Sequence, residues 1–396
     1  MKSVLMLAPR LPWPETSGGV IRVASLLRHM ARRYRFTLLS FMVPGERIAA
    51  EAAAAMVERR TGARVVLVGR NDASPAPPGF PALADFFRDP AMVRALEEAA
   101  RRERPDLIHL EFTQMAQYAE AAARWAPVIL TEHDSSSLYP ESTYHRGAGP
   151  DECDRLTAYL RRAFAACARV VAVSQADAAR LAPLMQAHKL AVVPTGVDLE
   201  RFTFAPLAGR RNGEAVFVGH YLHYPNEETA VRLCGEVMPL LRSRMPARLR
   251  LVGSGPTSAV RALAGPDVEV VGEVADVAPY LQRARVFLAP MRLGFGIKGK
   301  ILEAFACGTP VVASPQACEA MPLLVPGQHL LLGRDAAETA AAAARVLNGA
   351  ALSRALAERA RAYVESHFGW PAQAELLDRV YCAALASVPG AYGRNR

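Results

Sequence analysis

The sequence predicts an α/β protein built from two Rossmann-like, doubly wound domains. Short apolar runs alternate with helical patterns along most of its 396 residues. Within these runs apolar residues are continuous, as in parallel strands that are buried on both faces of a sheet. The pattern stops in a polar, turn-rich stretch at residues 194–213 and then starts again. We therefore expect two domains of similar size, residues 1–200 and 201–370, facing each other across a cleft with a hinge near residues 195–212.

The expected strands follow from the apolar runs. The first set comprises residues 4–7, 36–40, 64–68, 107–110, 128–130 and 170–173, and the second set residues 215–218, 249–252, 268–271, 286–289 and 310–313. Between the first two strands, Val20, Val23, Leu27 and Met30 repeat at helical spacing. This spacing predicts a helix at residues 20–30.

The C-terminal part of the chain is expected to be helical. Residues 336–368 are rich in alanine, a strong helix former, and predict a helical pair. Pro371 interrupts this pattern, because the residue before a proline is biased away from helical backbone angles. The last helix, residues 372–385 within the segment 371–396, is expected to pack back on the first domain.

The composition is typical of a globular enzyme, with 51% hydrophobic and 21% charged residues. No apolar stretch reaches the length of a membrane span. Residues 1–8 are similar to a short signal peptide but lack a small-residue cleavage site, so a buried first strand is expected. The six cysteines form no Cys-x-x-Cys pair and are expected to be reduced core thiols of a cytoplasmic protein.

The net charge of +9 has two interpretations. The arginines could lie on solvated helix faces, or they could form a basic face that attracts anionic lipid headgroups or a lipid-phosphate acceptor at the cytoplasmic membrane. Nucleic-acid binding is not expected, because the basic residues are not interleaved with aromatic ones and no nucleic-acid motif occurs.

A glycine-rich segment at residues 294–300 contains two of the four lysines of the chain, Lys298 and Lys300. It follows the apolar run that ends at Pro290 and precedes residues 301–305, which predict the first turns of a helix. Glycine lets a backbone approach a ligand closely, and the free N–H groups and dipole of a helix N-terminus favour anions. Two ammonium groups suit a diphosphate, so we interpret the segment as a nucleotide-diphosphate site.

Other interpretations of this segment stay open. The spacing of Gly294, Gly299 and Lys300 comes close to a phosphate-binding P-loop, but Ile301 stands where serine or threonine would bind magnesium. The segment could also be a surface loop with two solvated lysines. Glu303 could accept hydrogen bonds from both ribose hydroxyls, or it could act only as an acidic residue in a helix first turn.

Residues 301–314, Ile-Leu-Glu-Ala-Phe-Ala-Cys-Gly-Thr-Pro-Val-Val-Ala-Ser, resemble the donor-site signature of GT-B glycosyltransferases, specifically the retaining family 4. Further segments look like family segments in family order, namely residues 18–19, 131–134, 193–198, 215–219 with 224–226, 251–255 and 272–274. The lysine segment and the Tyr-Pro-Asn element are most similar to bacterial exopolysaccharide-associated sugar transferases. The resemblance implies transfer of a hexose from a nucleotide-diphosphate sugar to an acceptor hydroxyl, with retention at the anomeric carbon.

The resemblance also assigns roles to single residues of the donor segment. Glu303 matches the second glutamate of the family's paired-glutamate motif and would hold the nucleotide ribose. The first glutamate of that motif is replaced here by Phe295. Sugar recognition is therefore expected to use backbone N–H groups around residues 295–298.

A second departure from the family concerns the diphosphate. Many relatives carry an arginine and a lysine after the first strand of the second domain, where this chain has Gly219 followed by His220. We hypothesise that Lys298 and Lys300 supply the missing charge and stabilise the leaving diphosphate electrostatically.

In the first domain, Gly18, Gly19 and His133 follow expected strands at their carboxyl ends, where ligands of open parallel sheets bind. The glycines could form a simple connecting turn, or their N–H groups could face the diphosphate. His133 could be structural, but the resemblance places it by the donor sugar. Asp134 would orient this histidine or cap the next turn, and Ser174 is expected to be only a helix N-cap.

The candidate catalytic residues are accordingly His133, Lys298 and Lys300. The candidate nucleotide-sugar residues are Gly18, Gly19, Gly219, Asn226, Gly272, Val274, Gly294, Phe295, Gly296, Ile297, Gly299 and Glu303.

No metal or cofactor is expected besides the nucleotide-sugar substrate. The Asp-x-Asp motif of metal-dependent GT-A glycosyltransferases is absent from the sequence, and no His/Cys cluster replaces it. The expected partners are the donor and a glycan or lipid-linked acceptor. Two alternatives stay open: a nucleotide-sugar-binding GT-B subunit without turnover, which Phe295 favours, and a nucleotide-sugar epimerase of the same architecture.

Overall fold

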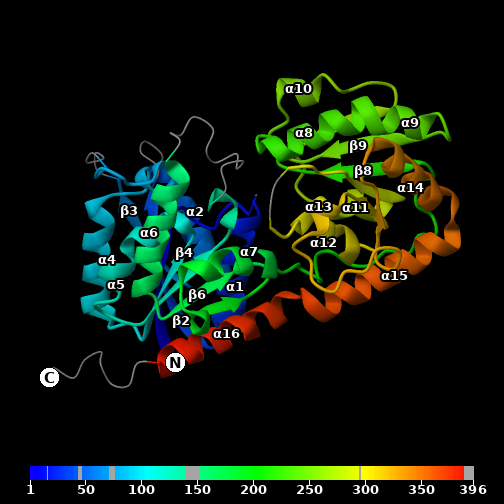
Figure 1. The fold of residues 1–396 in the computed structure, drawn as a ribbon. Helices are drawn as coiled ribbons and strands as arrows, with labels where there is room; N and C mark the ends of the chain where they lie inside the picture. The colour runs from blue at the N-terminus through cyan, green and yellow to red at the C-terminus, as the bar shows by residue number, and fades with distance from the viewer. Residues whose placement is uncertain (16, 43–46, 71–75, 139–150, 294–295, 388–396) are drawn as a thin grey trace. The chain divides into compact units, whose positions relative to one another are not determined.

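The structure, a computed structural model, describes residues 1–15, 17–42, 47–70, 76–138, 151–293 and 296–387. The chain forms two compact units, Met1–Pro194 with Gln373–Arg396 and Thr195–Ala372 (Figure 1). Each unit contains a parallel sheet with helices packed on it. The prediction of an α/β protein with two doubly wound sheets is therefore confirmed.

The sheet of the first unit has the strand order β3-β2-β1-β4-β5-β6-β7, and neighbouring strands pair in parallel. Strands β4 and β5 are buried along their whole length, as their continuous apolar runs predict. The sequence pattern does not predict β7, whose three residues are only partly buried. The strands are β1 Lys2–Ala8, β2 Tyr34–Met42, β3 Arg64–Gly69, β4 Leu107–Glu111, β5 Val128–Glu132, β6 Arg169–Ala172 and β7 Leu190–Val192.

Helices cover both faces of this sheet: α1 packs against α2, and α4 packs against β1, β2 and β3. The start of α4 is set by Asp89, whose side chain accepts a hydrogen bond from the Ala91 N–H at 2.8 Å. Its end is set by Arg104, which adopts a left-handed backbone conformation. The helices are α1 Gly18–Met30, α2 Arg47–Thr61, α3 Ala82–Asp85, α4 Pro90–Glu103, α5 Ala119–Ala122, α6 Glu152–Ala166 and α7 Gln175–Leu181.

The sheet of the second unit has the order β10-β9-β8-β11-β12-β13 and is also parallel. In Figure 1, α8 and α9 lie above β8 and β9, and α11 and α12 lie below them. The strands are β8 Glu214–Val218, β9 Arg248–Val252, β10 Val268–Gly272, β11 Val286–Ala289, β12 Val311–Ala313 and β13 Leu331–Leu332. The helices are α8 Tyr224–Arg232, α9 Met238–Arg242, α10 Ser258–Arg261, α11 Ala278–Arg283, α12 Gly299–Ala306, α13 Pro315–Cys318, α14 Ala336–Asn348 and α15 Ala350–His367.

Both sheets reverse their strand order at one point. In the first unit β1 lies between β2 and β4, and in the second unit β8 lies between β9 and β11. The connections that leave the two central strands at such a point run to opposite faces of the sheet, which leaves room for a ligand beyond the carboxyl ends. The segments that follow β1, β4, β8 and β11 are therefore the places where a site is expected.

The last helix, α16 Trp370–Ala386, begins two residues earlier than predicted. Pro371 lies in its first turn, where a missing N–H costs no intrahelical hydrogen bond. Further along the helix, Asp378 accepts a hydrogen bond from the Tyr34 hydroxyl at 2.7 Å, and the Tyr381 hydroxyl lies 2.7 Å from His109 Nδ1. These contacts attach the C-terminal half of α16 to the first unit.

The chain enters the second unit at Thr195. The buried Arg210 side chain donates hydrogen bonds to the carbonyl oxygens of Cys307 at 2.8 Å and Ala284 at 3.0 Å, and to that of Ala205. Such charge-assisted bonds fix their partners firmly when they are buried. The second half of the expected hinge at residues 195–212 is therefore bonded to the folded body of this unit through Arg210.

All six cysteines are free thiols. Cys167 and Cys307 are buried, as expected of core thiols, whereas Cys382 on α16 is exposed. None of the helices in the described part of the chain combines the length and apolar character that a bilayer-spanning helix requires.

Candidate functional site

The lysine segment of the second unit leads from β11 to α12. Helix α12 begins at Gly299 with Lys298 as its N-cap residue, and Ile301, Leu302 and Phe305 are buried in the core. The apolar side of the helix thus fixes its N-terminus beyond the carboxyl end of β11, as predicted. The N–H groups of a first helical turn have no intrahelical acceptor and are available to an anion. The predicted site residues Gly294 and Phe295 lie outside the described residues.

Lys300 is the lysine whose surroundings are best defined. Its Nζ lies 2.5 Å from Asn226 Oδ1 and 4.5 Å from the centre of the Phe217 ring. Burial, helped by the like charge of Lys298 and opposed by Glu303, lowers the pKa of Lys300 to about 7. The Asn226 amide carries no charge, so it does not raise the pKa of Lys300 back to its ordinary value as a carboxylate would. The Lys300 amine is therefore only partly protonated near neutral pH.

Asn226 connects Lys300 to the end of β8. Its amide Nδ2 donates a hydrogen bond to the His220 carbonyl oxygen at 2.8 Å. Gly219 lies directly against Asn226, because a Cβ at this glycine would come within 3.0 Å of the Asn226 side chain. Three predicted site residues, Gly219, Asn226 and Lys300, are therefore brought together at the point where the strand order reverses. The His220 ring lies beside them, with Nδ1 2.9 Å from Ser254 Oγ.

Glycines let the ends of three neighbouring strands approach one another here. Gly253, just after β9, has φ +131°, and a Cβ on it would lie 2.0 Å from the Gly219 carbonyl oxygen. Its N–H donates to the carbonyl oxygen of Gly272, the last residue of β10, at 2.7 Å. Only glycine allows this approach. The predicted residues Val274 and Ile297 instead pack against the apolar core of the unit.

Glu303 lies one turn after Lys300 on α12. Burial raises the pKa of its carboxyl group, and the cations Arg201 and Lys300 oppose this shift. No hydrogen bond joins the Glu303 carboxylate to any other residue that the structure describes. Lys298 Nζ donates to the carbonyl oxygen of Gly296 at 3.3 Å. The two lysines and Glu303 thus belong to one cluster at the start of α12.

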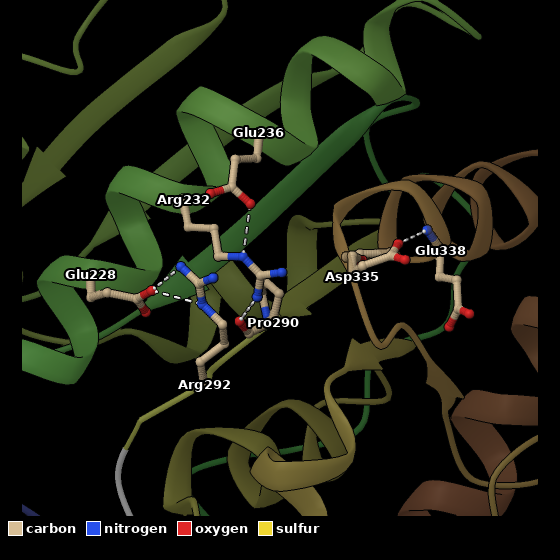
Figure 2. A network of polar contacts seen from close by, with 8 residues as sticks. Glu228, Arg232, Glu236, Pro290, Arg292, Asp335 and Glu338 are labelled. Carbon is tan, nitrogen blue, oxygen red and sulfur yellow. Dashed lines mark hydrogen bonds and ion pairs between the residues drawn. The ribbon is translucent and has the colours of Figure 1, made fainter. Parts of the chain in front are cut away.

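Two arginines that the sequence analysis does not single out fix the chain between β11 and the lysine segment (Figure 2). The buried Arg232 of α8 donates to the Pro290 carbonyl oxygen at 2.8 Å and to Glu236 at 3.0 Å. Arg292 reaches back to Glu228 of α8 at 2.7 Å. Arg232 and Glu236 form an ordinary i,i+4 pair along the sequence, so only the fold reveals the contact with Pro290.

In the first unit, His133 follows β5 and hydrogen-bonds to a carboxylate of the neighbouring strand. Its Nε2 lies 2.7 Å from Glu111 Oε2, and Glu111 is fully buried. The hydrogen-bond partner of His133 Nε2 is thus Glu111 at the end of β4, whereas Asp134, for which we expect a role in orienting this histidine or in capping the next turn, acts on its pKa through charge. Ser174 is the N-cap of α7, as predicted, and accepts a hydrogen bond from the Asp177 N–H at 3.0 Å.

Gly18 and Gly19 form the first turn of α1 and not a separate connecting turn. A Cβ on Gly19 would lie 2.6 Å from Phe112 and 3.2 Å from His133 Nδ1. Phe112 stacks on the His133 ring with 3.7 Å between the ring centres. The predicted residues Gly19 and His133 are therefore neighbours beyond the ends of β1, β4 and β5.

Comparison with known proteins identifies both halves of the chain. Residues 16–201 match the family described as Glycosyltransferase Family 4, and residues 213–349 match Glycosyl transferases group 1. A D-inositol 3-phosphate glycosyltransferase of Salinispora arenicola is 30% identical over 318 residues, which cover 71% of this chain and 69% of that protein.

Solved structures share the fold across both units. The sucrose-phosphate synthase of Thermosynechococcus elongatus has a TM-score of 0.75 at 19% identity and covers 98% of this chain and 100% of that one. The Anabaena protein HepE, solved in complex with UDP and glucose, has a TM-score of 0.69 at 16% identity, with the same coverage of both chains.

The unusual pKa of Lys300 can be measured directly, because the chain has only four lysines. In protein labelled with ¹³C-lysine, we expect one Cε signal to titrate near pH 7, and Lys300→Met removes that signal. The variant Asn226→Asp places a carboxylate beside Nζ, and the attraction between opposite charges should raise this pKa by about one unit or more. Titration of all four lysines near their ordinary value of about 10.4 would contradict the buried position of Nζ.

Proposed function

The chain belongs to the glycosyltransferases of group 1 and family 4, and we propose that it transfers a sugar from a nucleotide-diphosphate sugar to an acceptor hydroxyl with retention at the anomeric carbon. One observation carries this proposal. Lys300 Nζ is held between the Asn226 amide and the Phe217 ring at the start of α12, beyond the carboxyl ends of β8 and β11. A cation at such a helix N-terminus suits a diphosphate.

The chemistry follows from where negative charge develops. When the bond between the sugar and the diphosphate breaks, the leaving phosphate oxygens gain charge. Lys298, Lys300 and the N–H groups of the first turn of α12 neutralise that charge without rearrangement. Because the pKa of Lys300 is about 7, a bound diphosphate draws a proton onto Nζ and is paired with a full positive charge. This pairing makes a metal ion unnecessary in the proposed reaction.

The other candidate residues take supporting roles in this proposal. Asn226 holds Lys300 in place, and Glu303, whose carboxylate has no hydrogen-bond partner in the described chain, receives the ribose hydroxyls. Gly219 and Gly272 keep the strand ends free of side chains. In the first unit, Gly18, Gly19 and His133 are the candidate residues for contact with a substrate.

The donor and acceptor are proposed by chemical class. The Anabaena protein HepE was solved with UDP and glucose, which makes a uridine nucleotide the first donor to test. The Salinispora relative is named for inositol 3-phosphate, an anionic polyol. A net charge of +9 suits an anionic acceptor of this kind or a lipid-linked glycan at the cytoplasmic membrane surface. Surface or exopolysaccharide assembly is the proposed context.

The proposal is tested with purified protein, UDP-, GDP- and ADP-sugars and EDTA. We expect one donor to raise the unfolding temperature, since a ligand at a hundred times its Kd stabilises the fold by about 2.7 kcal/mol. With acceptor present, proton NMR should show the anomeric configuration of the donor in the product.

Three results would contradict the proposal in distinguishable ways. Conversion of the donor without acceptor would indicate an epimerase. Binding without transfer or hydrolysis would indicate a binding subunit. The phenylalanine at position 295, which replaces the first glutamate of the family motif, is the feature that favours this alternative. Binding only with magnesium would exclude the metal-independent mechanism.

The lysine pair is tested by the combined substitutions Lys298→Ala and Lys300→Ala. Loss of both ammonium groups should lower kcat by a factor of about 100 or more, because they stabilise the leaving diphosphate. The matched control is Lys2→Ala with Lys189→Ala, which changes the net charge equally but lies in the first unit. Turnover at the control level in the Lys298 and Lys300 variant would exclude the proposed role.

A further inference from the structure

We propose that Glu111 is a positioning residue for His133: it holds the imidazole in the tautomer that carries hydrogen on Nε2, so that Nδ1 is an acceptor facing the first turn of α1. This inference rests on the proposed function, because it assigns the state in which His133 meets the donor sugar. Nothing in the sequence pattern singles out Glu111, which ends an apolar run and belongs to a buried strand.

The geometry of two neighbouring strands brings the pair together. β4 and β5 run in parallel, with Glu111 opposite Thr131, so that His133 lies just beyond the end of β5. The distance from His133 Nε2 to Glu111 Oε2 is 2.7 Å. An ionised carboxylate has only acceptor atoms, so the hydrogen of this bond belongs to Nε2. A neutral ring then leaves the lone pair on Nδ1.

The surrounding charges keep Glu111 ionised although it is fully buried. Burial alone would raise its pKa, but the interaction with His109, the hydrogen bond from His133 Nε2 and the charge of the Arg22 guanidinium together lower it. Arg22 is itself buried and hydrogen-bonds through Nη1 to the Pro194 carbonyl oxygen at 2.7 Å. No hydrogen bond reaches its Nε and Nη2 from the described chain, nor Glu111 Oε1. The positive charge of Arg22 therefore adds to the attraction that favours the ionised form of Glu111.

Every element packed around His133 contributes to its titration. Burial lowers the pKa of His133; Glu111 on β4 and Asp134 oppose this shift, and Arg22 on α1 adds to it. His109 on β4 and Tyr381 on α16 complete the group, with Tyr381 bonded to His109 Nδ1. The net effect is a neutral imidazole near pH 7, which is the form that can accept a hydrogen bond at Nδ1.

The orientation of the His133 ring is fixed by Phe112 on one face and by Glu111 at Nε2. Phe112 stacks on it at an interplanar angle of 11°, and Phe112 has φ +74°, a left-handed conformation that is uncommon for an aromatic residue. Gly19 lies against the edge of Phe112 and beside His133 Nδ1, where a side chain of any other residue would collide with Phe112. No residue of the described chain hydrogen-bonds to Nδ1. That atom is therefore available to a substrate hydroxyl beside the N-terminus of α1.

The first experiment reads the tautomer of the unmodified protein. In histidine labelled with ¹⁵N, long-range proton–nitrogen correlations distinguish the two neutral tautomers, and His133→Gln assigns the signals. We expect hydrogen on Nε2 of His133. Hydrogen on Nδ1 would overturn the inference, and this measurement needs neither a Glu111 variant nor any transfer activity.

The second experiment uses Glu111→Gln, an isosteric change that removes the charge and lets the amide donate or accept. We expect a mixture of His133 tautomers and a kcat lowered by about tenfold or more, as for other residues that orient a functional histidine. KM for the donor should change little. Because Glu111 raises the pKa of His133, its loss should move the acid limb of the kcat/KM profile to lower pH.

A double-mutant cycle and a neighbouring carboxylate provide the controls. Glu111→Gln should add little to the loss caused by His133→Gln, because both act on the same hydrogen bond. The control variant is Glu132→Gln. The Glu132 carboxyl group is as buried as that of Glu111 and accepts a hydrogen bond from the Thr113 hydroxyl at 2.5 Å. Burial raises the pKa of Glu132 to about 8. An amide there replaces a mostly protonated carboxyl group, so the His133 tautomer and kcat should be unchanged.

The outcomes separate this inference from the proposed function. Additive losses, or an unchanged tautomer and pH profile in a folded Glu111→Gln variant, would overturn the role of Glu111 while transfer itself persists. If no donor supports transfer, the proposed function fails, and the tautomer measurement still decides what Glu111 does to His133.

Discussion

The partly buried position of the Lys300 ammonium beside a neutral amide is the constraint on which the proposed site in the second unit depends. A lysine in water is fully charged at neutral pH, but burial lowers the pKa of Lys300 to about 7. The Lys300 amine can occupy this position because Asn226 Oδ1 accepts a hydrogen bond from Nζ and the Phe217 ring lies beneath it. The same strand-order reversal that opens the sheet here also places the N-terminus of α12 beside it.

The two units differ in how they hold charged side chains at the ends of their strands. In the second unit burial lowers the pKa of Lys300, whereas in the first unit Arg22 and Glu111 are both buried and Glu111 hydrogen-bonds to His133. In both, glycines at strand or helix ends remove side chains where the backbone must come close, as at Gly19 and Gly253. A prepared polar environment of this kind stabilises developing charge without reorganisation during the reaction.

The sequence predicted the fold well because buried parallel strands leave continuous apolar runs. It did not predict β7 or β13, since the first is only partly buried and the second has two residues. Lys300 could be chosen from the sequence, because a glycine segment before a helix start favours anions. Gly219 and Asn226 could be chosen only from the resemblance to family 4. Glu111 and Arg232 could not be chosen from the sequence, since each acts through a partner that only the folded chain brings near.

The central claim is that cations and free N–H groups at the start of α12 neutralise a diphosphate. A crystal structure of the protein with a bound nucleoside diphosphate tests this most directly. The account predicts phosphate oxygens within about 3 Å of Lys300 Nζ and of the first N–H groups of α12, with the ribose at Glu303. Phosphates bound elsewhere, or bridged by a divalent ion, would contradict it.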